Sequence, residues 1–267
     1  MAEDKVGFIG AGNIAGAIFN GIVSSGYIKP SNVLVYDPIK EKTDAFTAKG
    51  AVYAESAPKL TELCDFVFLT VKPQIYEEVL NSIKFVADNT CFIDVAAGIT
   101  ISYVKSILGA NTAVVRVMPN TPLMYGTGSS AIVKDKSVSD AQFNFVKGCF
   151  DSSGVTCVVD EKHIDTVTAV SGSAPAYIML MMNSFIDFAT KQGMNAEDAK
   201  KIIVGAFSGT ANMVNSDKRD IEELIRMVTS PKGTTEEGLS SLNNDNFKQV
   251  IDNCLSATLK RAKELSK

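Results

Sequence analysis

The chain has 267 residues, of which 46% are hydrophobic and 21% charged, a composition typical of a soluble globular protein with a substantial core. Its formal net charge of −4 removes any electrostatic basis for binding nucleic acid or an anionic membrane surface. The five cysteines never form a Cys-X-X-Cys pair and there is one histidine, so we expect free thiols and no metal site. The N-terminus lacks a signal-peptide pattern, and the longest apolar run, around Ala174–Met182, is too short to span a bilayer, which predicts a cytoplasmic protein.

The first predicted element is a strand that runs into a glycine-rich turn. Residues 5–16 read Lys-Val-Gly-Phe-Ile-Gly-Ala-Gly-Asn-Ile-Ala-Gly, and a helical pattern of apolar residues follows at once. Gly10 allows the tight turn, Gly12 lets the backbone approach a pyrophosphate, and the small Ala15 permits contact between helix and strand. The N–H groups that open the helix then face an anion with the helix dipole behind them. The pattern predicts a dinucleotide site, and a structural glycine turn is the alternative.

Short apolar strands alternate with helical segments from residue 5 to about residue 160. This alternation predicts a mostly parallel, doubly wound α/β sheet, which binds its ligands at the carboxyl ends of the strands. We expect strands at Lys5–Gly10, Asn32–Tyr36, Phe66–Val71, Cys91–Val95, Thr112–Met118, Ser130–Val133 and Thr156–Val159. We expect helices at Ile14–Ser25, Lys40–Lys49, Ala57–Leu63, Ile75–Val86, Ile101–Leu108 and Ser139–Phe150.

Unusual residues gather where these strands end. Asp37 follows the second strand, where an acid can accept hydrogen bonds from both ribose hydroxyls of NAD and repel the 2′-phosphate of NADP. A turn aspartate before proline is the alternative interpretation. Lys72 precedes a proline that fixes an extended turn, although it can equally be a surface charge. Residues 96–98 (Ala-Ala-Gly) leave room for a flat ring, and residues 116–122 (Arg-Val-Met-Pro-Asn-Thr-Pro) form a rigid polar turn.

The second half of the chain shows only helical spacing. We therefore predict a dinucleotide-binding domain over residues 1–160 and a helical domain over residues 161–267. Pro175 lies inside one of the predicted helices, which indicates a kink or a packing reason. Residues 177–182 (Tyr-Ile-Met-Leu-Met-Met) are apolar nearly all round, which predicts burial, for example against another subunit. One long helix is expected over Ile164–Val170 and Ala174–Lys191, interrupted at residues 171–175, and further helices are expected at Ala196–Val214, Ile221–Val228 and Asp245–Lys263.

A polar loop between two of these helices is the second informative stretch. Residues 229–239 read Thr-Ser-Pro-Lys-Gly-Thr-Thr-Glu-Glu-Gly-Leu, in which Pro231 and Gly233 shape a turn. Thr234 or Thr235 can cap the helix that follows. Hydroxyls and free N–H groups at a helix N-terminus suit a carboxylate, although an ordinary capped helix explains the same residues.

Together these stretches resemble the pyrroline-5-carboxylate reductases, in the order of that family and over essentially the whole chain. The resemblance implies an N-terminal Rossmann-type doubly wound sheet followed by an all-helical domain that forms an interlocked homodimer, often assembled into a larger homo-oligomer. It also implies hydride transfer from NADH or NADPH to the C=N carbon of 1-pyrroline-5-carboxylate, which gives L-proline. The matching motifs are residues 7–15, 71–74, 96–99, 116–122, 168–177 and 230–235.

The resemblance also assigns site residues, which we state here as expectations. Asp37 would lie beside the adenosine ribose, and Asp160 or Glu161 is similar to an acidic position near the substrate. Thr235 would be the catalytic residue, with a hydrogen bond to the ring nitrogen and a proton relayed from water. Substrate would be bound by Gly233, Thr234, Thr235 and Glu161. The rest of the cofactor would be bound by Ile9, Gly10, Ala11, Gly12, Asn13, Ile14, Ser56 or its neighbour, Thr70, Val71, Lys72, Pro73, Ala97 and Gly98.

Two residues depart from the family pattern. Many members have residues suited to a 2′-phosphate at the position of Asp37, so this chain is expected to prefer NADH over NADPH. Lys232 stands where the family usually has glycine. If that position needs positive φ, lysine there is strained; alternatively, its ammonium group helps to hold an anionic ligand.

Two other functions compete with this interpretation. A β-hydroxyacid or 6-phosphogluconate type dehydrogenase needs a lysine early in the first long helix of its second domain, and here none occurs before Lys191. A non-catalytic dinucleotide sensor would leave the hydroxyl-rich loop at residues 230–235 without a purpose. Both alternatives are therefore weaker than the reductase.

Overall fold

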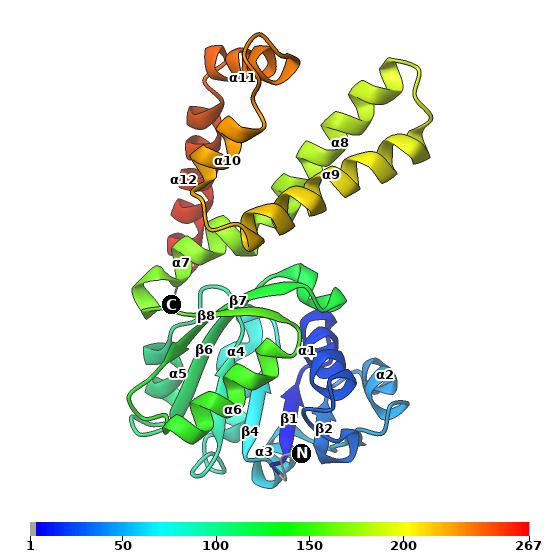
Figure 1. The fold of residues 1–267 in the computed structure, drawn as a ribbon. Helices are drawn as coiled ribbons and strands as arrows, with labels where there is room; N and C mark the ends of the chain where they lie inside the picture. Colours follow the sequence, from blue (N-terminus) through cyan, green and yellow to red (C-terminus); the bar gives the residue numbers. More distant parts are fainter. Residues whose placement is uncertain (1–3, 267) are drawn as a thin grey trace. The chain divides into compact units, whose positions relative to one another are not determined.

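The computed structural model describes residues 4–266, which form two compact units (Figure 1). The first unit contains the chain up to Ser173 together with the segment from Thr258 onward, and the second is Ala174–Ala257. These units are defined by contacts, and their boundary differs from the one predicted at residue 160. The predicted boundary divides a dinucleotide-binding domain from a helical domain that binds substrate and a second copy, and it stays a prediction. The long C-terminal helix begins in the second unit and ends in the first.

The first unit is built on an eight-stranded sheet in the order β3-β2-β1-β4-β5-β6-β7-β8. Neighbouring strands are parallel except β6 and β7, which are antiparallel. The short β3 was not predicted, because two residues are too few for an alternation to be visible. The strands are β1 Val6–Ile9, β2 Val33–Tyr36, β3 Val52–Tyr53, β4 Phe66–Leu69, β5 Cys91–Asp94, β6 Ala113–Pro119, β7 Gly128–Lys134 and β8 Gly154–Val158.

Helices cover both faces of this sheet (Figure 1). Successive residues of a strand point to opposite faces, so Phe8 of β1 packs with α1, α2 and α6, whereas Ile9 packs with α3, α4 and α5. All residues of β1, β4 and β5 are buried, as expected for central strands of a parallel sheet. The helices are α1 Asn13–Ser24, α2 Asp44–Thr47, α3 Ala57–Leu63, α4 Tyr76–Ile83, α5 Ile101–Leu108, α6 Asp140–Asp151 and α7 Ile164–Val167.

The second unit is helical, as predicted. A π-helical turn at Thr168–Gly172 precedes it, so α8 starts at Ala174 and Pro175 falls in its first turn, where the missing N–H has no intrahelical partner to lose. The helical irregularity expected at the proline therefore lies one turn earlier. The helices are α8 Ala174–Lys191, α9 Ala196–Ser216, α10 Ile221–Met227, α11 Thr234–Asn244 and α12 Phe247–Leu265.

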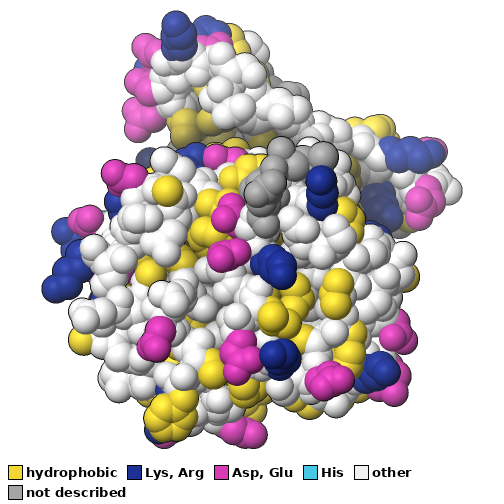
Figure 2. All heavy atoms as spheres, turned by 90° about the horizontal axis from the view of Figure 1, so that it is seen from below, with side chains coloured by type: hydrophobic (Ala, Val, Ile, Leu, Met, Phe, Trp, Pro, Cys, Tyr) yellow, Lys and Arg dark blue, Asp and Glu magenta, His cyan; other side chains and the backbone are white. Residues whose placement is uncertain are grey.

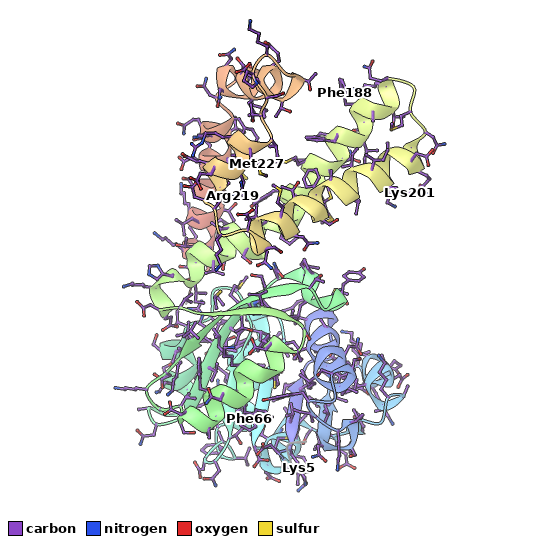
Figure 3. All side chains as sticks on the ribbon, in the orientation of Figure 1. Lys5, Phe66, Phe188, Lys201, Arg219 and Met227 are labelled. Carbon is purple, nitrogen blue, oxygen red and sulfur yellow. The ribbon has the colours of Figure 1, made fainter. Side chains whose placement is uncertain are left out.

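Apolar side chains of the second unit are mostly uncovered within the chain. Helix α8 has no buried residue, and Leu180 is 68% exposed. Figure 3 labels Phe188 of α8 and Met227 of α10, which are also exposed. An apolar surface of this extent indicates an interaction with another molecule. The burial predicted for residues 177–182 therefore does not occur inside one chain.

One continuous helical run, Glu161–Lys191, is long and apolar enough to cross a membrane by length and composition, with a mean hydropathy of 1.2. The sequence prediction considered the apolar stretch at Ala174–Met182 alone and so did not find this run. One such helix is weak evidence for a membrane span, because an apolar helix in a soluble oligomer has the same composition.

Candidate active site

The glycine turn follows β1 and has the conformation that its sequence predicts. Gly10 has φ +98°, and its N–H donates to the Tyr36 carbonyl at 2.8 Å. A Cβ added to Gly10 would lie 2.8 Å from the Thr70 carbonyl oxygen, so only glycine fits. Gly12 is the N-cap of α1 without a side-chain cap, and nothing lies within 4 Å of a Cβ placed there. The start of α1 is therefore exposed and has no side-chain cap, as an anion site requires.

Asp37 is a turn aspartate before proline, as the alternative interpretation expected, and it also supports the glycine turn, which the sequence prediction missed. Its Oδ2 accepts a hydrogen bond from the Ala11 N–H at 3.0 Å, and its Oδ1 accepts one from the Ile39 N–H at 2.9 Å. The residue is 7% exposed, and Lys42 Nζ lies 3.9 Å from Oδ1. Each carboxylate oxygen can accept a second hydrogen bond, so the predicted contact with a ribose hydroxyl is compatible with this geometry.

Thr70 at the end of β4 holds the same turn from the neighbouring strand. Its hydroxyl lies 2.9 Å from the Ile9 carbonyl oxygen and 2.7 Å from the Gly10 carbonyl oxygen, and the side chain is buried. The hydroxyl is thus engaged with the backbone of the turn. Thr70 shapes the predicted cofactor site, and its own contact with the cofactor stays a prediction.

Two hollows flank the glycine turn. The first, of about 240 Å³, brings together four predicted cofactor residues: Ile9, Gly10, Ser56 and Val71. Ser56 also caps α3, where its side chain accepts a hydrogen bond from the Lys59 N–H. Lining residues that the sequence prediction missed are Tyr36, Pro38, Ala57, Pro58, Ile75, Glu78, Val79 and Ser82.

The second hollow, of about 260 Å³, joins the start of α1 to the polar turn after β6. Asn13 and Ile14, predicted to bind pyrophosphate, line it with Pro119, Asn120 and Thr121. Met124 and Gly172 complete the lining. The turn at residues 116–122 therefore lies where the sequence prediction placed it, beside the expected cofactor path.

The remaining cofactor-side residues differ in exposure. Lys72 is exposed and precedes a short 3₁₀ turn that begins at Pro73, and Ala97 is also exposed. Gly98 has φ +79°, and a Cβ there would lie 2.5 Å from the Leu265 carbonyl oxygen. Gly98 is thus required for packing against the end of α12, and the space for a flat ring expected at residues 96–98 stays a prediction.

The hydroxyl-rich loop belongs to the second unit. Gly233 is the N-cap of α11, so the predicted cap by Thr234 or Thr235 is wrong, and both threonines lie in the first turn. A Cβ at Gly233 would lie 2.9 Å from the Ser230 carbonyl oxygen, which explains why the cap is glycine. Both threonines are exposed, and within residues 4–266 neither hydroxyl has a hydrogen-bond partner. They are therefore available to a ligand.

Lys232 in this loop has φ +60°, so the strained alternative of the sequence analysis applies. Its backbone N–H donates to Glu236 Oε2 at 2.6 Å, which holds the residue in this conformation. Its side chain is exposed. The second alternative, attraction of an anionic ligand by its ammonium group, stays a prediction.

Comparison with known proteins identifies relatives over the whole chain. The family described as pyrroline-5-carboxylate reductase dimerisation matches residues 161–265, and that described as NADP oxidoreductase, coenzyme F420-dependent, matches residues 5–98. The pyrroline-5-carboxylate reductase of Escherichia coli is 32% identical over 267 residues, which cover 99% of each chain. That of Pseudomonas aeruginosa is 33% identical over 269 residues, which cover 100% of this chain and 98% of the relative. This chain belongs to the pyrroline-5-carboxylate reductase family.

Solved structures of the family agree with the fold described above. A Plasmodium falciparum pyrroline carboxylate reductase with NADP bound has a TM-score of 0.92 at 32% identity, covering 100% of both chains. A pyrroline-5-carboxylate reductase from Coxiella burnetii has a TM-score of 0.94 at 31% identity, again covering 100% of both chains. The predicted family and fold class are confirmed. The match to a dimerisation region at residues 161–265 also accounts for the apolar side chains that the second unit exposes.

Asp160 and Glu161, the two alternatives for the acidic position expected near the substrate, have other partners in this structure. Glu161 Oε1 accepts a hydrogen bond from the Ile101 N–H at 2.9 Å and lies 3.0 Å from Arg116 Nη1. Asp160 is exposed and lies 3.1 Å from Lys162 Nζ. Glu161 is thus part of the framework of the first unit, and its predicted contact with substrate stays a prediction.

A buried polar chain extends inward from Glu161, and the sequence prediction missed it. Asp94 of β5 is fully buried, and burial raises its pKa to about 7, although hydrogen bonds from Tyr76 and the Ala96 N–H and the charge of Arg116 oppose the rise. The Tyr76 hydroxyl lies 2.6 Å from Asp94 Oδ1. The sequence signal for these buried polar contacts was a charged residue inside each of two apolar strands, Asp in Cys-Phe-Ile-Asp and Arg in Val-Val-Arg-Val.

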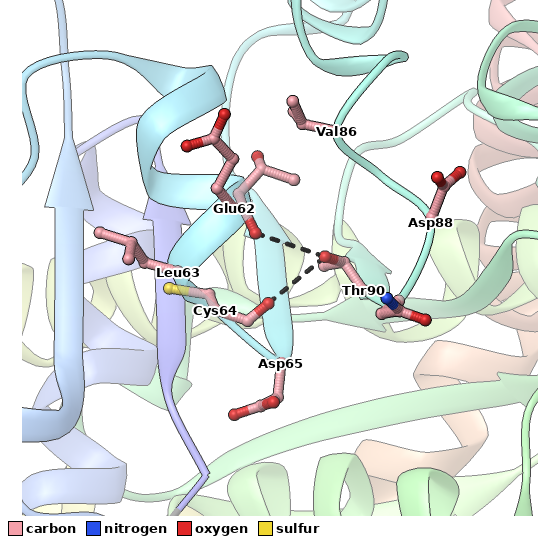
Figure 4. Close-up of a pocket in the computed structure, with 9 residues that line it drawn as sticks. Glu62, Leu63, Cys64, Asp65, Val86, Asp88 and Thr90 are labelled. Carbon is pink, nitrogen blue, oxygen red and sulfur yellow. Dashed lines mark hydrogen bonds between the residues drawn. The ribbon is translucent and has the colours of Figure 1, made fainter.

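A third hollow, of about 350 Å³, lies at the amino ends of β4 and β5, away from the carboxyl ends of the strands (Figure 4). Thr90 donates to main-chain carbonyls of Thr61 and Cys64 there. Ligands of such sheets bind at the carboxyl ends of the strands, and this hollow contains none of the predicted site residues. Its acidic side chains, Glu62, Asp65 and Asp88, would also repel an anionic cofactor. It is not a candidate active site.

The charged side chains do not suggest another type of ligand. On the face that Figure 2 shows, basic and acidic residues are interspersed rather than gathered by sign. Within residues 4–266, no group of three or more His, Cys, Asp or Glu side chains could hold a metal ion.

Proposed function

We propose that the protein is a pyrroline-5-carboxylate reductase, which uses NADH or NADPH to reduce the C=N bond of 1-pyrroline-5-carboxylate to L-proline. The observation that carries the proposal is the presence of two open sites in one chain of this family. The first is the free N-terminus of α1 at Gly12, and the second is the pair of exposed hydroxyls at Thr234 and Thr235. The first suits a dinucleotide and the second a small carboxylate.

The residues of the first unit fit a dinucleotide. The N–H groups that begin α1, after Gly12, would hold the pyrophosphate, because they are uncapped and open to solvent. The hollow lined by Ser56 and Val71 would take the adenosine side, and the hollow lined by Asn13 and Asn120 would take the nicotinamide side. When bound, the reduced cofactor supplies the hydride.

The chain contributes orientation and a proton path to this reaction. A protonated imine is already a good electrophile, so correct placement of the two reactants supplies most of what catalysis requires. Thr234 and the N–H groups at the start of α11 would hold the substrate carboxylate. The Thr235 hydroxyl would hydrogen-bond the ring nitrogen and relay a proton from water.

We further propose that NADH is preferred over NADPH, and that the protein works in the cytoplasm as a homo-oligomer. The buried carboxylate of Asp37 supports the cofactor preference, since it would repel a 2′-phosphate. Lys42, whose side chain is 51% exposed and close to Asp37, acts in the opposite direction. A ratio of kcat/KM for NADH to that for NADPH below one would overturn the preference. Substitution Asp37→Ser is expected to lower this ratio roughly tenfold or more.

The test of the main function is oxidation of reduced cofactor in the presence of 1-pyrroline-5-carboxylate, followed by absorbance. We expect saturable turnover and formation of proline. When a β-keto acid, the product of the competing β-hydroxyacid dehydrogenase reaction, replaces 1-pyrroline-5-carboxylate, we expect no oxidation of the cofactor. The Thr235→Ala variant should lose roughly 10²-fold in kcat. The control is Thr190→Ala, which removes an exposed hydroxyl that bonds only within α8. Absence of turnover with the wild-type protein, or full activity of Thr235→Ala, would refute the function or the role of the residue respectively.

A further inference from the structure

The loop between β5 and α5, residues 95–100, is held at both ends by carboxylates. At its start, Asp94 Oδ1 accepts a hydrogen bond from the Ala96 N–H at 2.9 Å. At its end, Glu161 Oε1 accepts a hydrogen bond from the Ile101 N–H at 2.9 Å. The two carboxylates lie far apart in the sequence, so the conformation of this loop depends on tertiary structure rather than on its own residues.

Arg116 contacts one of the two carboxylates and acts on the other through its charge. It is the register partner of Asp94 on the adjacent strand β6, so the two side chains leave the sheet on the same face as neighbours. Its Nη1 lies 3.0 Å from Glu161 Oε1, and its charge favours the ionised form of Asp94. With 3% exposure, Arg116 has almost no contact with solvent. One buried guanidinium thus connects the groups that fix both ends of the loop.

This arrangement is unfavourable as a device for stability alone. Asp94 Oδ2 and Arg116 Nε and Nη2 are buried, and within the described residues they have no hydrogen-bond partner. Unpaired buried polar atoms reduce stability, and well-packed apolar residues often replace a buried ion pair without loss. A role in placing the loop gives a reason for charged residues in an otherwise apolar part of the sheet.

We propose that Arg116 is a positioning residue, which acts through Asp94 and Glu161 to set the loop at residues 95–100 against the cofactor. The proposal rests on the proposed function and on the family resemblance, which implies that Ala97 and Gly98 of this loop line the cofactor path. The loop follows β5, so it lies at the carboxyl ends of the strands, as the glycine turn after β1 does. Arg116 itself touches neither cofactor nor substrate. It affects the reaction by where it holds the loop backbone.

The experiment compares variants of the full-length protein in cofactor binding and kinetics. Arg116→Met removes the charge at similar volume, Arg116→Lys keeps a charge, and Glu161→Gln keeps an acceptor for the Ile101 N–H. The control is Asp135→Asn, which breaks the comparably buried ion pair with Lys105 without touching the loop. The dissociation constant for reduced cofactor is measured by its fluorescence without substrate, and KM values, kcat and the melting temperature are measured separately.

For Arg116→Met we expect a roughly ten- to hundredfold loss in kcat/KM for the cofactor, with a KM for 1-pyrroline-5-carboxylate that changes much less. Arg116→Lys should recover part of this loss, and Asp135→Asn should change melting temperature but not cofactor affinity. If Arg116→Met lowers only the melting temperature, as the control does, the residue is merely structural and the proposal is wrong. Because binding is measured without substrate, this outcome is separate from a failure of the wild-type protein to reduce 1-pyrroline-5-carboxylate.

Discussion

The two units of the chain bury their apolar residues in different ways. In the first, both faces of the sheet are covered by helices of the same chain, and large side chains such as Phe8, Phe68 and Phe92 are completely buried. In the second, Leu224 is one of the few large apolar side chains that are buried. An apolar hollow of about 610 Å³ lies open there between α8 and α9, lined by residues such as Phe185 and Phe207. The first unit therefore contains a complete core, whereas the second leaves much of its apolar surface open within one chain, as the match to a dimerisation region would explain.

The largest expected effect is that of a charge on the open face of the second unit. Leu180→Glu should abolish dimerisation, because burying an unpaired charge costs about 3–5 kcal/mol and symmetry places it twice in each dimer. Light scattering measures the change in mass. The control is Phe85→Glu in the first unit, where the wild-type side chain is 85% exposed. Equal dimer mass for both variants would show that exposure on α8 has nothing to do with assembly.

A smaller loss is expected for a methyl group in the glycine turn of the first unit. Gly10→Ala combines an unfavourable positive φ with a contact against the Thr70 carbonyl, so it should cost about 2–4 kcal/mol of unfolding free energy. Denaturant titration measures this loss, and cofactor affinity should fall with it. Gly12→Ala is the control, since a Cβ there meets nothing within 4 Å. If Gly10→Ala is as stable as Gly12→Ala, the close approach of the turn to β4 is not a constraint.

This difference between the units also explains how far the sequence could be interpreted. In the first unit, alternation of apolar strands and helices identified seven of the eight strands, because local patterns there correspond to burial within the chain. In the second unit the helices were predictable, but the burial expected for residues 177–182 does not occur within the chain, since no residue of α8 is buried. Motif residues such as Gly10 and Gly233 were found from sequence.

What the sequence could not supply is the hydrogen bonding between distant segments. Asp37 supports the backbone at Ala11, and Glu161 contacts Arg116 and Ile101; neither pairing has a local signature. Gly98 makes room for the backbone of Leu265, which its sequence did not indicate. Each of these contacts is one that only the folded chain creates.

The closed core of the first unit should also make the stability of the protein depend on pH. Burial raises the pKa of Asp94 to about 7, above its value of about 3.9 in an unfolded chain. The folded state therefore binds a proton more tightly, so the stability contributed by this group is complete below about pH 4 and is lost as the pH rises through about 7. A protonated Asp94 can also donate to the Tyr76 oxygen while the Tyr76 hydroxyl donates to the Leu69 carbonyl.

Melting temperatures between pH 5 and pH 8 test this expectation. The wild-type protein should lose stability over this range relative to Asp94→Asn, whose side chain does not titrate. Asp140→Asn, which removes an exposed carboxyl in the same unit, should leave the wild-type slope unchanged. Parallel curves for wild type and Asp94→Asn would mean that Asp94 is already ionised, or already neutral, throughout the range.

The smallest expected effect returns to the second unit, where Lys232 has φ +60°. Lys232→Gly should raise the free energy of unfolding by about 1 kcal/mol, because glycine adopts this conformation without strain. Asn246 is a matched control with φ +54°; asparagine tolerates positive φ better, so Asn246→Gly should gain less.

The Lys232→Gly variant also separates the two roles of the lysine. If its ammonium group attracts the substrate carboxylate, Lys232→Gly gains stability but increases KM for 1-pyrroline-5-carboxylate, and this increase should shrink at high salt. An unchanged KM would leave Lys232 as a strained residue without a part in binding.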